Sequence, residues 1–205
     1  SKKKGSWKMN KVLYIKSTPK STDDSWSLKM SENFLENYRR FNPDDVIDEL
    51  DLYSEGIQPL SGDELRKMPV PEETEEKKYA SQFMEYDKFI IAAPFWNFSI
   101  PSILKAYIDR LLIAGKTFRY TESGFQSFVS GKKSIFFMGR GGVYSEEPMK
   151  SMENGIKYLN LIFRAFFGME TDSAVLEGTN MYSRDTLNKK FDEIKPELEE
   201  KATLF

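Results

Sequence analysis

Three loops of this sequence contain residue types that could together hold a flat, negatively charged molecule. The most informative loop follows the apolar run 90–93 and contains Phe95, Trp96, Asn97 and Phe98. An apolar run of this length is typical of a buried strand, and the proline after it cannot donate a ladder hydrogen bond. Aromatic residues near a strand end are often core residues, but consecutive side chains cannot all point inward. Because ligands of open α/β sheets bind beyond the carboxyl ends of strands, this loop is a candidate floor for a ring.

The second loop precedes the first predicted helix and is rich in hydroxyl groups, among them Ser17, Ser25 and Ser27. The first amides of a helix have no intrahelical acceptor, and the helix dipole favours negative charge, so such a loop can bind a phosphate. Ordinary capping by Asp24 or Ser25 explains the same residues. The carboxylates of Asp23 and Asp24 oppose an anion unless they point away from it.

The third loop is the glycine-rich segment 139–142, which follows another apolar run. Glycine allows the backbone to approach a ligand closely, although an isolated run of this kind is by default a turn. It is not the G-x-G-x-x-G pattern of dinucleotide folds, which follows the first strand. Arg140 in this loop either attracts the charge of a ligand or faces solvent.

Composition narrows the classes of function. The chain has 205 residues, 40% of them hydrophobic, which fits one domain, here assigned to 9–205. The net charge of −2 does not favour nucleic acid or a membrane surface as a partner. Without cysteine or histidine there is no thiolate, no imidazole base and no ordinary zinc or non-haem iron site, so a cofactor is the better explanation for any chemistry. We expect a cytoplasmic protein, with 1–8 as a native extension or a tag remnant.

Alternating patterns predict the elements that position these loops. The strands are predicted at 11–16, 45–52, 87–94, 132–139 and 171–178. The helices are predicted at 27–41, 72–86, 101–114, 147–168 and 183–201, with a long loop at 53–71. Strands alternating with helices imply a parallel sheet with right-handed crossovers. The prediction is an α/β, flavodoxin-like three-layer sandwich of strand order 2-1-3-4-5, in which the three loops converge.

Several motifs make the chain resemble a known family. They are KVLYIKST at 11–18, SWSL at 25–28, AAPFWNFSIPSILKAYIDRL at 92–111, GKTFRYTESG at 115–124 and GRGGVYS at 139–145. In this combination the chain resembles the FMN-dependent NADH-azoreductases, flavodoxin-like homodimers related to NAD(P)H:quinone reductases. The resemblance spans nearly the whole chain from Met9.

The resemblance implies a non-covalent FMN site and no metal. It assigns the FMN phosphate to Ser17, Ser25, Trp26 and Ser27. It assigns the isoalloxazine ring to Pro94, Phe95, Trp96, Asn97, Phe98, Gly139, Arg140, Gly141 and Gly142. On the substrate side it places Phe98, Tyr120 and Phe166, the last of these supplied by the partner subunit. The pair Asp23 and Asp24, and Trp96 where the family commonly has tyrosine, depart from the family pattern.

The implied reaction is hydride transfer from NADH or NADPH to flavin N5, followed by reduction of a quinone or azo compound in the same place. A homodimer is implied too, and the aromatic helices at 102–112 and 147–167 support it, with Phe163, Phe166 and Phe167 as candidate interface residues. Two alternatives remain from the sequence. One is a flavodoxin-like electron carrier that serves protein partners, and the other is a relative that binds no cofactor.

Overall fold

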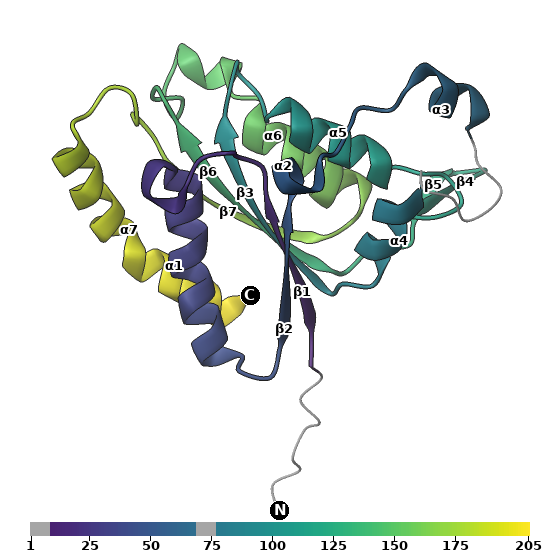
Figure 1. Cartoon of the computed structure of the whole chain (residues 1–205), viewed down its shortest axis with the longest axis horizontal. Coiled ribbons are helices and arrows are strands. Elements are labelled where there is room, and N and C mark those ends of the chain that lie inside the picture. The colour runs from purple at the N-terminus through teal and green to yellow at the C-terminus, as the bar shows by residue number, and fades with distance from the viewer. Residues whose placement is uncertain (1–8, 69–76) are drawn as a thin grey trace, which may run out of the picture.

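The computed structural model describes residues 9–68 and 77–205, so the segment 1–8 and parts of the predicted loop 53–71 and helix 72–86 lie outside the described residues. At its centre is a parallel sheet (Figure 1). Its strands, in spatial order, are β2 (Val46–Asp51), β1 (Lys11–Lys16), β3 (Lys88–Phe95), β6 (Lys133–Arg140) and β7 (Glu170–Leu176). This order confirms the predicted 2-1-3-4-5 arrangement of a flavodoxin-like α/β sheet.

The three inner strands are buried on both faces, which explains their continuous apolar sequences. The edge strand β2 reads VIDELD and exposes much of its length. Parallel pairing also places the ends of β1, β3 and β6 along one edge of the sheet, where the three candidate loops begin.

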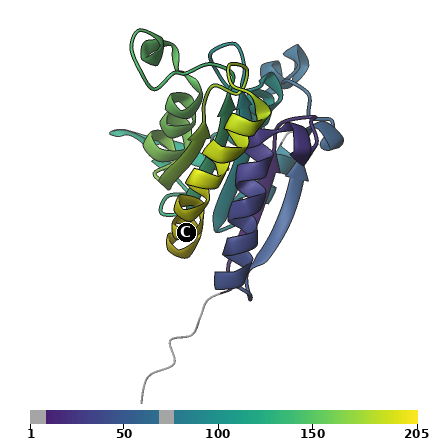
Figure 2. The same ribbon diagram turned by 90° about the vertical axis from the view of Figure 1, so that its left-hand side faces the viewer.

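Helices cover both faces of this sheet, as the two views show (Figures 1 and 2). One face packs against α1 (Trp26–Phe41) and α7 (Arg184–Leu204), which run side by side. The other carries α4 (Lys78–Met84), α5 (Ser102–Leu111) and α6 (Gly155–Leu159). Each face has its own apolar cluster, so the described part forms the three layers that the sequence predicts.

The predicted loop 53–71 is wrong in part, because two short helices occupy it: α2 (Leu52–Glu55) and α3 (Gly62–Lys67). Ser61 and Glu64 form a reciprocal capping box at the start of α3, a sequence signal for a helix that the prediction missed. Arg110 of α5 anchors this region by donating to the carbonyl of Gln58 and to Glu64.

The predicted helix 147–168 is also shorter than expected. Its first residues form a loop with one 3-10 turn, η3 (Met149–Met152), and α6 begins only at Gly155. The Glu153 carboxylate accepts hydrogen bonds from the amides of Gly155 and Ile156, and it therefore caps the helix at this point. The second half of the helix is a π-helical segment, η4 (Asn160–Phe166).

A small antiparallel hairpin was not predicted: β4 (Phe118–Thr121) and β5 (Gly124–Ser127). Each strand has four residues, the lower limit for an alternating pattern, and only β4, which reads FRYT, alternates aromatic with polar residues. The hairpin is held by ring contacts: Phe125 stacks on Phe166 at 4.3 Å between ring centroids, and Phe118 meets Phe166 edge to face at 5.0 Å.

Candidate functional site

A cavity of about 910 Å³ opens at the carboxyl edge of the sheet. It is lined by Thr18, Lys20, Asp24, Ser25, Trp26, Ser27, Pro94, Phe95, Trp96, Asn97, Phe98, Gly139, Gly141, Gly142, Tyr144, Thr179, Asn180, Met181, Tyr182, Arg184 and Leu187. All three candidate loops contribute to it. Its size is within the range of sites for small molecules and cofactors.

The hydroxyl-rich loop enters the cavity at the start of α1. Ser25 is the N-cap residue, and its hydroxyl accepts from the amide of Leu28 at 3.4 Å. The hydroxyls of Ser25 and Ser27 lie 3.0 Å apart and both residues are buried. Capping by Ser25 is thus confirmed, and the next two residues, Trp26 and Ser27, whose amides have no intrahelical acceptor, line the cavity. This wall is suited to an anion.

Ser17 does not line the cavity. Its buried hydroxyl donates to the carbonyl of Ala92 at 2.9 Å, and its amide donates to the same carbonyl at 3.0 Å. These bonds join the end of β1 to β3. The neighbouring Thr18 lines the cavity instead, although the prediction did not single it out.

Charged residues at this end of the cavity are Lys20, Asp24 and Arg184. The carboxylate of Asp24 accepts a hydrogen bond from Ser21, at 2.9 Å. Arg184 lies over the Trp26 ring, 5.0 Å from its centroid, and donates to the backbone carbonyl of Asp23. Two cations and one carboxylate leave a net positive charge at the hydroxyl-rich end, which favours an anionic group there.

The aromatic loop is a tight β-turn. Trp96 and Ser99 exchange two backbone hydrogen bonds of 3.0 Å, and the residues between them have positive φ, 49° at Asn97 and 66° at Phe98. A turn of this kind usually has glycine at its second central position, so a phenylalanine there holds a strained backbone.

The strained turn presents rings at the cavity mouth. Trp96 and Phe98 keep 37% and 47% of their surface exposed, whereas Phe95 is buried. This agrees with the expectation that the consecutive rings cannot all face the core. An exposed ring in a strained turn is a feature that folding alone does not require.

The glycine loop forms the facing wall. A Cβ on Gly139 would lie 3.3 Å from the Cβ of Trp26 and 3.5 Å from the amide nitrogen of Ser27, so the absence of a side chain lets β6 pack closely against the start of α1. Gly141 and Gly142 accept backbone hydrogen bonds from Asn180 and Gly178 in the loop after β7. That loop therefore supports the wall and lines the cavity beside it.

Arg140 does not face solvent, and its side chain is absent from the cavity lining. It is buried between two carboxylates, at 2.9 Å from Glu177 and 3.1 Å from Glu153. Burial alone would raise the pKa of Glu177, but hydrogen bonds from Ser145, the Tyr144 amide and Arg140 lower it. The guanidinium of Arg140 is thus held as part of the scaffold behind the cavity.

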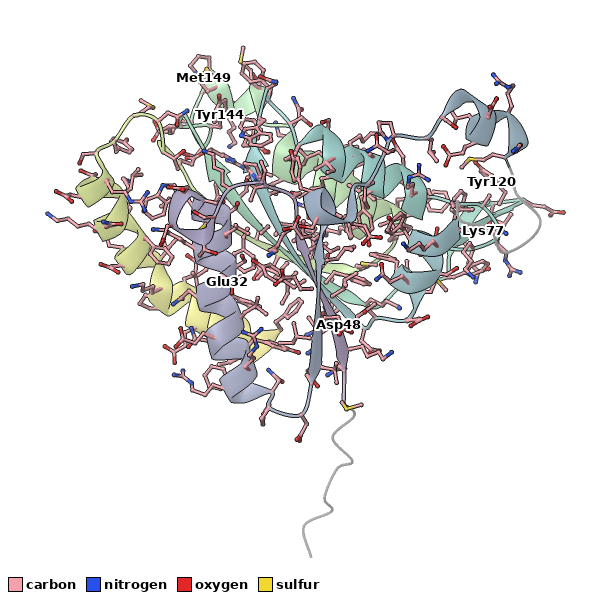
Figure 3. All side chains as sticks on the ribbon, in the orientation of Figure 1. Glu32, Asp48, Lys77, Tyr120, Tyr144 and Met149 are labelled. Atoms are coloured by element: carbon pink, nitrogen blue, oxygen red, sulfur yellow. The ribbon has the colours of Figure 1, made fainter. Side chains whose placement is uncertain are left out.

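Tyr120 and Phe166 are not brought to the cavity by this chain. Figure 3 shows Tyr120 and the cavity residue Tyr144 far apart, and Tyr120 lies on the hairpin. Phe166 packs on that same hairpin. Phe163 and Phe167, expected at an interface, are instead fully buried in the core of their own chain.

The lining also contains residues that the prediction missed, namely Tyr144 and the segment that runs from Thr179 to Arg184. Their position after β6 and after β7 is the available signal, because both strands end at the same edge of the sheet. Among residues 9–68 and 77–205 no three acidic residues gather as a metal site, and no helix is long and apolar enough to cross a bilayer.

Comparison with known proteins agrees with the fold described above. A family model described as a flavodoxin-like fold matches residues 10–202. A protein of Clostridium acetobutylicum named FMN-dependent NADH:quinone oxidoreductase 2 is 49% identical over 166 residues, 78% of this chain and 82% of that protein. An FMN-dependent NADH:quinone oxidoreductase of Coprothermobacter proteolyticus is 37% identical over 202 residues, 96% of this chain and all of that protein.

Solved structures agree in shape over nearly the whole chain. An azoreductase from Bacillus anthracis str. Sterne has a TM-score of 0.86 and 34% identity, covering 96% of this chain and 100% of that one. An FMN-dependent NADH-azoreductase from Bacillus anthracis str. Ames Ancestor, solved in complex with FMN, has a TM-score of 0.83 and 28% identity, covering 95% of this chain and 98% of that one.

Proposed function

The chain belongs to the family with a flavodoxin-like fold and, within it, to the FMN-dependent NADH:quinone oxidoreductases, and on this premise we propose how its cavity performs that activity. The protein is an FMN-dependent oxidoreductase that uses NAD(P)H to reduce quinones and azo compounds. The observation that carries the proposal is the strained aromatic turn, which lines the same cavity as a helix N-terminus.

The residues present fit FMN. The phosphate requires donors and positive charge, which the first amides of α1, the hydroxyls of Ser25 and Ser27, and Lys20 supply. The ring requires a wall that it can approach closely, and the uncovered backbone of Gly139, Gly141 and Gly142 supplies one in the cavity lining. The proposed ring-binding residues are Pro94, Phe95, Trp96, Asn97, Phe98, Gly139, Gly141 and Gly142.

Bound FMN supplies a hydride acceptor and donor at ring position N5. The protein then has to bind and orient flat substrates, which requires neither histidine nor cysteine. The exposed rings of Trp96 and Phe98 provide faces on which a nicotinamide or a quinone stacks, each contact contributing on the order of 1 kcal/mol. NAD(P)H and the acceptor occupy this place in turn, as in a ping-pong reaction.

We place the complete site at the interface of a homodimer. The hairpin exposes Tyr120, Phe125 and Phe128, whose exposed fractions are 77%, 46% and 39%. Exposed rings gathered on one small element favour a contact with another chain. A partner that brings Tyr120 and Phe166 over the cavity would unite them with Phe98. Sedimentation at micromolar concentration tests this, and a monomer alone contradicts it.

The test of function is a visible spectrum of the FMN-reconstituted and desalted protein, followed by anaerobic addition of NADH and then of a quinone. A flavin band that is retained, bleaches with NADH and recovers with the quinone supports the proposal. A band that NADH does not bleach within minutes supports an electron carrier instead. Loss of the flavin on desalting contradicts FMN binding and draws attention to Asp23 and Asp24.

A further inference from the structure

A buried charge cluster lies behind the cavity and takes no part in the function described so far. Arg140 is the last residue of β6 and pairs in register with Phe95, the last residue of β3. Glu177 directly follows β7, and Glu153 precedes α6. Arg140 and Glu153 are 7% and 6% exposed. One guanidinium thus connects the ends of two strands with the start of a helix.

Through Glu177 the cluster holds Tyr144. One oxygen of the Glu177 carboxylate accepts both from Arg140, at 2.9 Å, and from the backbone amide of Tyr144, at 2.8 Å. The Tyr144 ring meets Phe95 edge to face at 4.7 Å and Phe98 at 6.3 Å. Arg140 lies 5.6 Å from the centroid of Phe95 on the same wall. The position of Tyr144 therefore depends on the orientation of Glu177.

Through Glu153 the cluster reaches Phe98. Glu153 binds the amides of Gly155 and Ile156 at 2.8 Å, which orients the segment before α6. In that segment the amide of Asn154 donates to the carbonyl of Phe98 at 3.2 Å. This bond supports the strained residue of the aromatic turn from outside the turn.

The two carboxylates bind different terminal nitrogens of Arg140, and Nε is buried without a partner among the described residues. The terminal fork of the guanidinium is therefore the part that orients the cluster. A lysine keeps the charge but not the planar fork, so it cannot hold both carboxylates in this geometry. Removing one partner of a buried ion pair is costly because a charge remains unpaired.

We propose that Arg140 is a positioning residue: through Glu177 and Glu153 it fixes Tyr144 and Phe98, and so sets the spacing of these two rings in the part of the cavity that admits flat electron acceptors. The assignment to electron acceptors rests on the proposed function, but the positioning itself does not. When the cluster is loosened, this part of the cavity discriminates less between acceptors, while the residues that hold the phosphate stay in place.

The first experiment is amide hydrogen exchange in the protein without flavin, comparing Arg140→Lys with the natural chain. The amides of Tyr144 and Asn154 should exchange at least ~10-fold faster in the variant, since each reports one arm of the cluster. Unchanged exchange at both amides overturns the proposal, whether or not the protein binds FMN.

Glu177→Gln is the second variant, for the case in which Arg140→Lys does not fold. It should accelerate exchange of the Tyr144 amide and leave that of Asn154 within about twofold, because only one arm is altered. Its matched control is Asp45→Asn at the opposite edge of the sheet, where a buried carboxylate also accepts from a backbone amide, that of Asn10 at 2.7 Å. The control should accelerate exchange at Asn10 and leave Tyr144 and Asn154 unchanged.

The second experiment uses the FMN-loaded variants and two acceptors of different width, benzoquinone and an anthraquinone sulfonate. We expect the ratio of the two kcat/KM values to move at least ~5-fold closer to unity, because selectivity is lost. The change should appear in KM and not in the limiting rate of flavin bleaching by NADH. The visible circular dichroism of the bound flavin should change as well. An unchanged ratio and dichroism overturn the role in acceptor selection, whereas failure of the natural chain to bleach contradicts only the proposed function.

Discussion

A buried cation, carboxylates and aromatic rings form a cluster at each of two edges of the central sheet. One edge is formed by the amino ends of the strands and the other by their carboxyl ends, and the two clusters serve different purposes. At the amino edge, Lys88 lies 3.8 Å from Asp45 and rests over the rings of Tyr38 and Phe205. At the carboxyl edge, Arg140 lies between Glu153 and Glu177 and over the ring of Phe95. In both places a partly buried carboxylate also accepts a hydrogen bond from a backbone amide.

The difference lies in what surrounds each cluster. The rings at the amino edge pack against further core residues, since Phe34 contacts both Tyr38 and Phe205. The rings at the carboxyl edge border a cavity, and the backbone there is strained at Phe98. A buried ion pair by itself therefore indicates neither a stable core nor a site. Its neighbours decide which of the two it serves.

The largest expected effect is a loss of FMN affinity when a side chain is added to the cavity wall at the carboxyl edge. In Gly139→Val the new side chain meets Trp26 and the amide of Ser27, so FMN affinity should fall at least ~100-fold. Titration of the variant with FMN, followed by flavin fluorescence, measures it. Val12→Ala in the core is the control, expected to lower stability without this loss of affinity. Retained FMN affinity in Gly139→Val would show that the start of α1 does not bind the phosphate.

At the amino edge we expect a substitution to lower stability and to leave FMN affinity unchanged. Lys88→Met leaves Asp45 without its cation. The hydrogen bonds from Tyr38 and Asn10 to this carboxylate remain, so the free energy of unfolding should fall by about 1 kcal/mol. Chemical denaturation measures this change. FMN affinity should stay within twofold, because the cluster lies at the edge away from the cavity. A variant that loses FMN while it stays folded would remove the distinction between the edges.

The carboxyl group of Asp45, at the amino edge, should contribute to the pH dependence of stability. Burial alone would raise the pKa of Asp45, but hydrogen bonds from Tyr38 and Asn10 and the charge of Lys88 lower it. A carboxyl whose pKa is lowered by folding stabilises the protein above its unfolded value of about 4, and this contribution is lost as the pH falls through the lowered pKa.

In Asp45→Asn the group no longer titrates. Its free energy of unfolding should be lower than that of the natural chain at pH 7, and the two values should converge as the pH falls below about 4. Denaturation at a series of pH values gives the comparison. Parallel curves for the two proteins would show that Asp45 does not supply this dependence.

The smallest expected effect is a gain in stability. Phe98→Gly removes the positive-φ strain, and the free energy of unfolding should rise by up to about 1 kcal/mol. The same change removes a stacking face, so kcat/KM for a quinone should fall about 5-fold. Phe128→Ala, an exposed ring outside the turn, is the control for stability. A destabilised Phe98→Gly variant would show that the turn is not strained.

The sequence was sufficient to predict the sheet order and most of the cavity, because both depend on local patterns. Apolar runs mark the inner strands, and proline or glycine marks where they end. The left-handed turn at Asn97 and Phe98 was not predictable, since phenylalanine disfavours that conformation. The pairing of Arg140 with Glu177 depends on contacts across 37 residues, which no local pattern encodes.

The hairpin is the clearest failure of prediction. Its strands are short, and they are held by Phe166, which comes from a distant part of the chain. The sequence also suggested an interface at Phe163 and Phe167, but the fold buries both residues in the core of the chain. Aromatic residues on one helix do not reveal which of them a neighbouring element will cover.

One consequence of the cavity wall concerns observation of the molecule. The chain has three tryptophans, and two of them, Trp26 and Trp96, line the cavity from opposite loops. Indole emission overlaps flavin absorption, so energy transfer should dim both residues when the site is filled. Tryptophan fluorescence should therefore report FMN binding and release in the unlabelled protein.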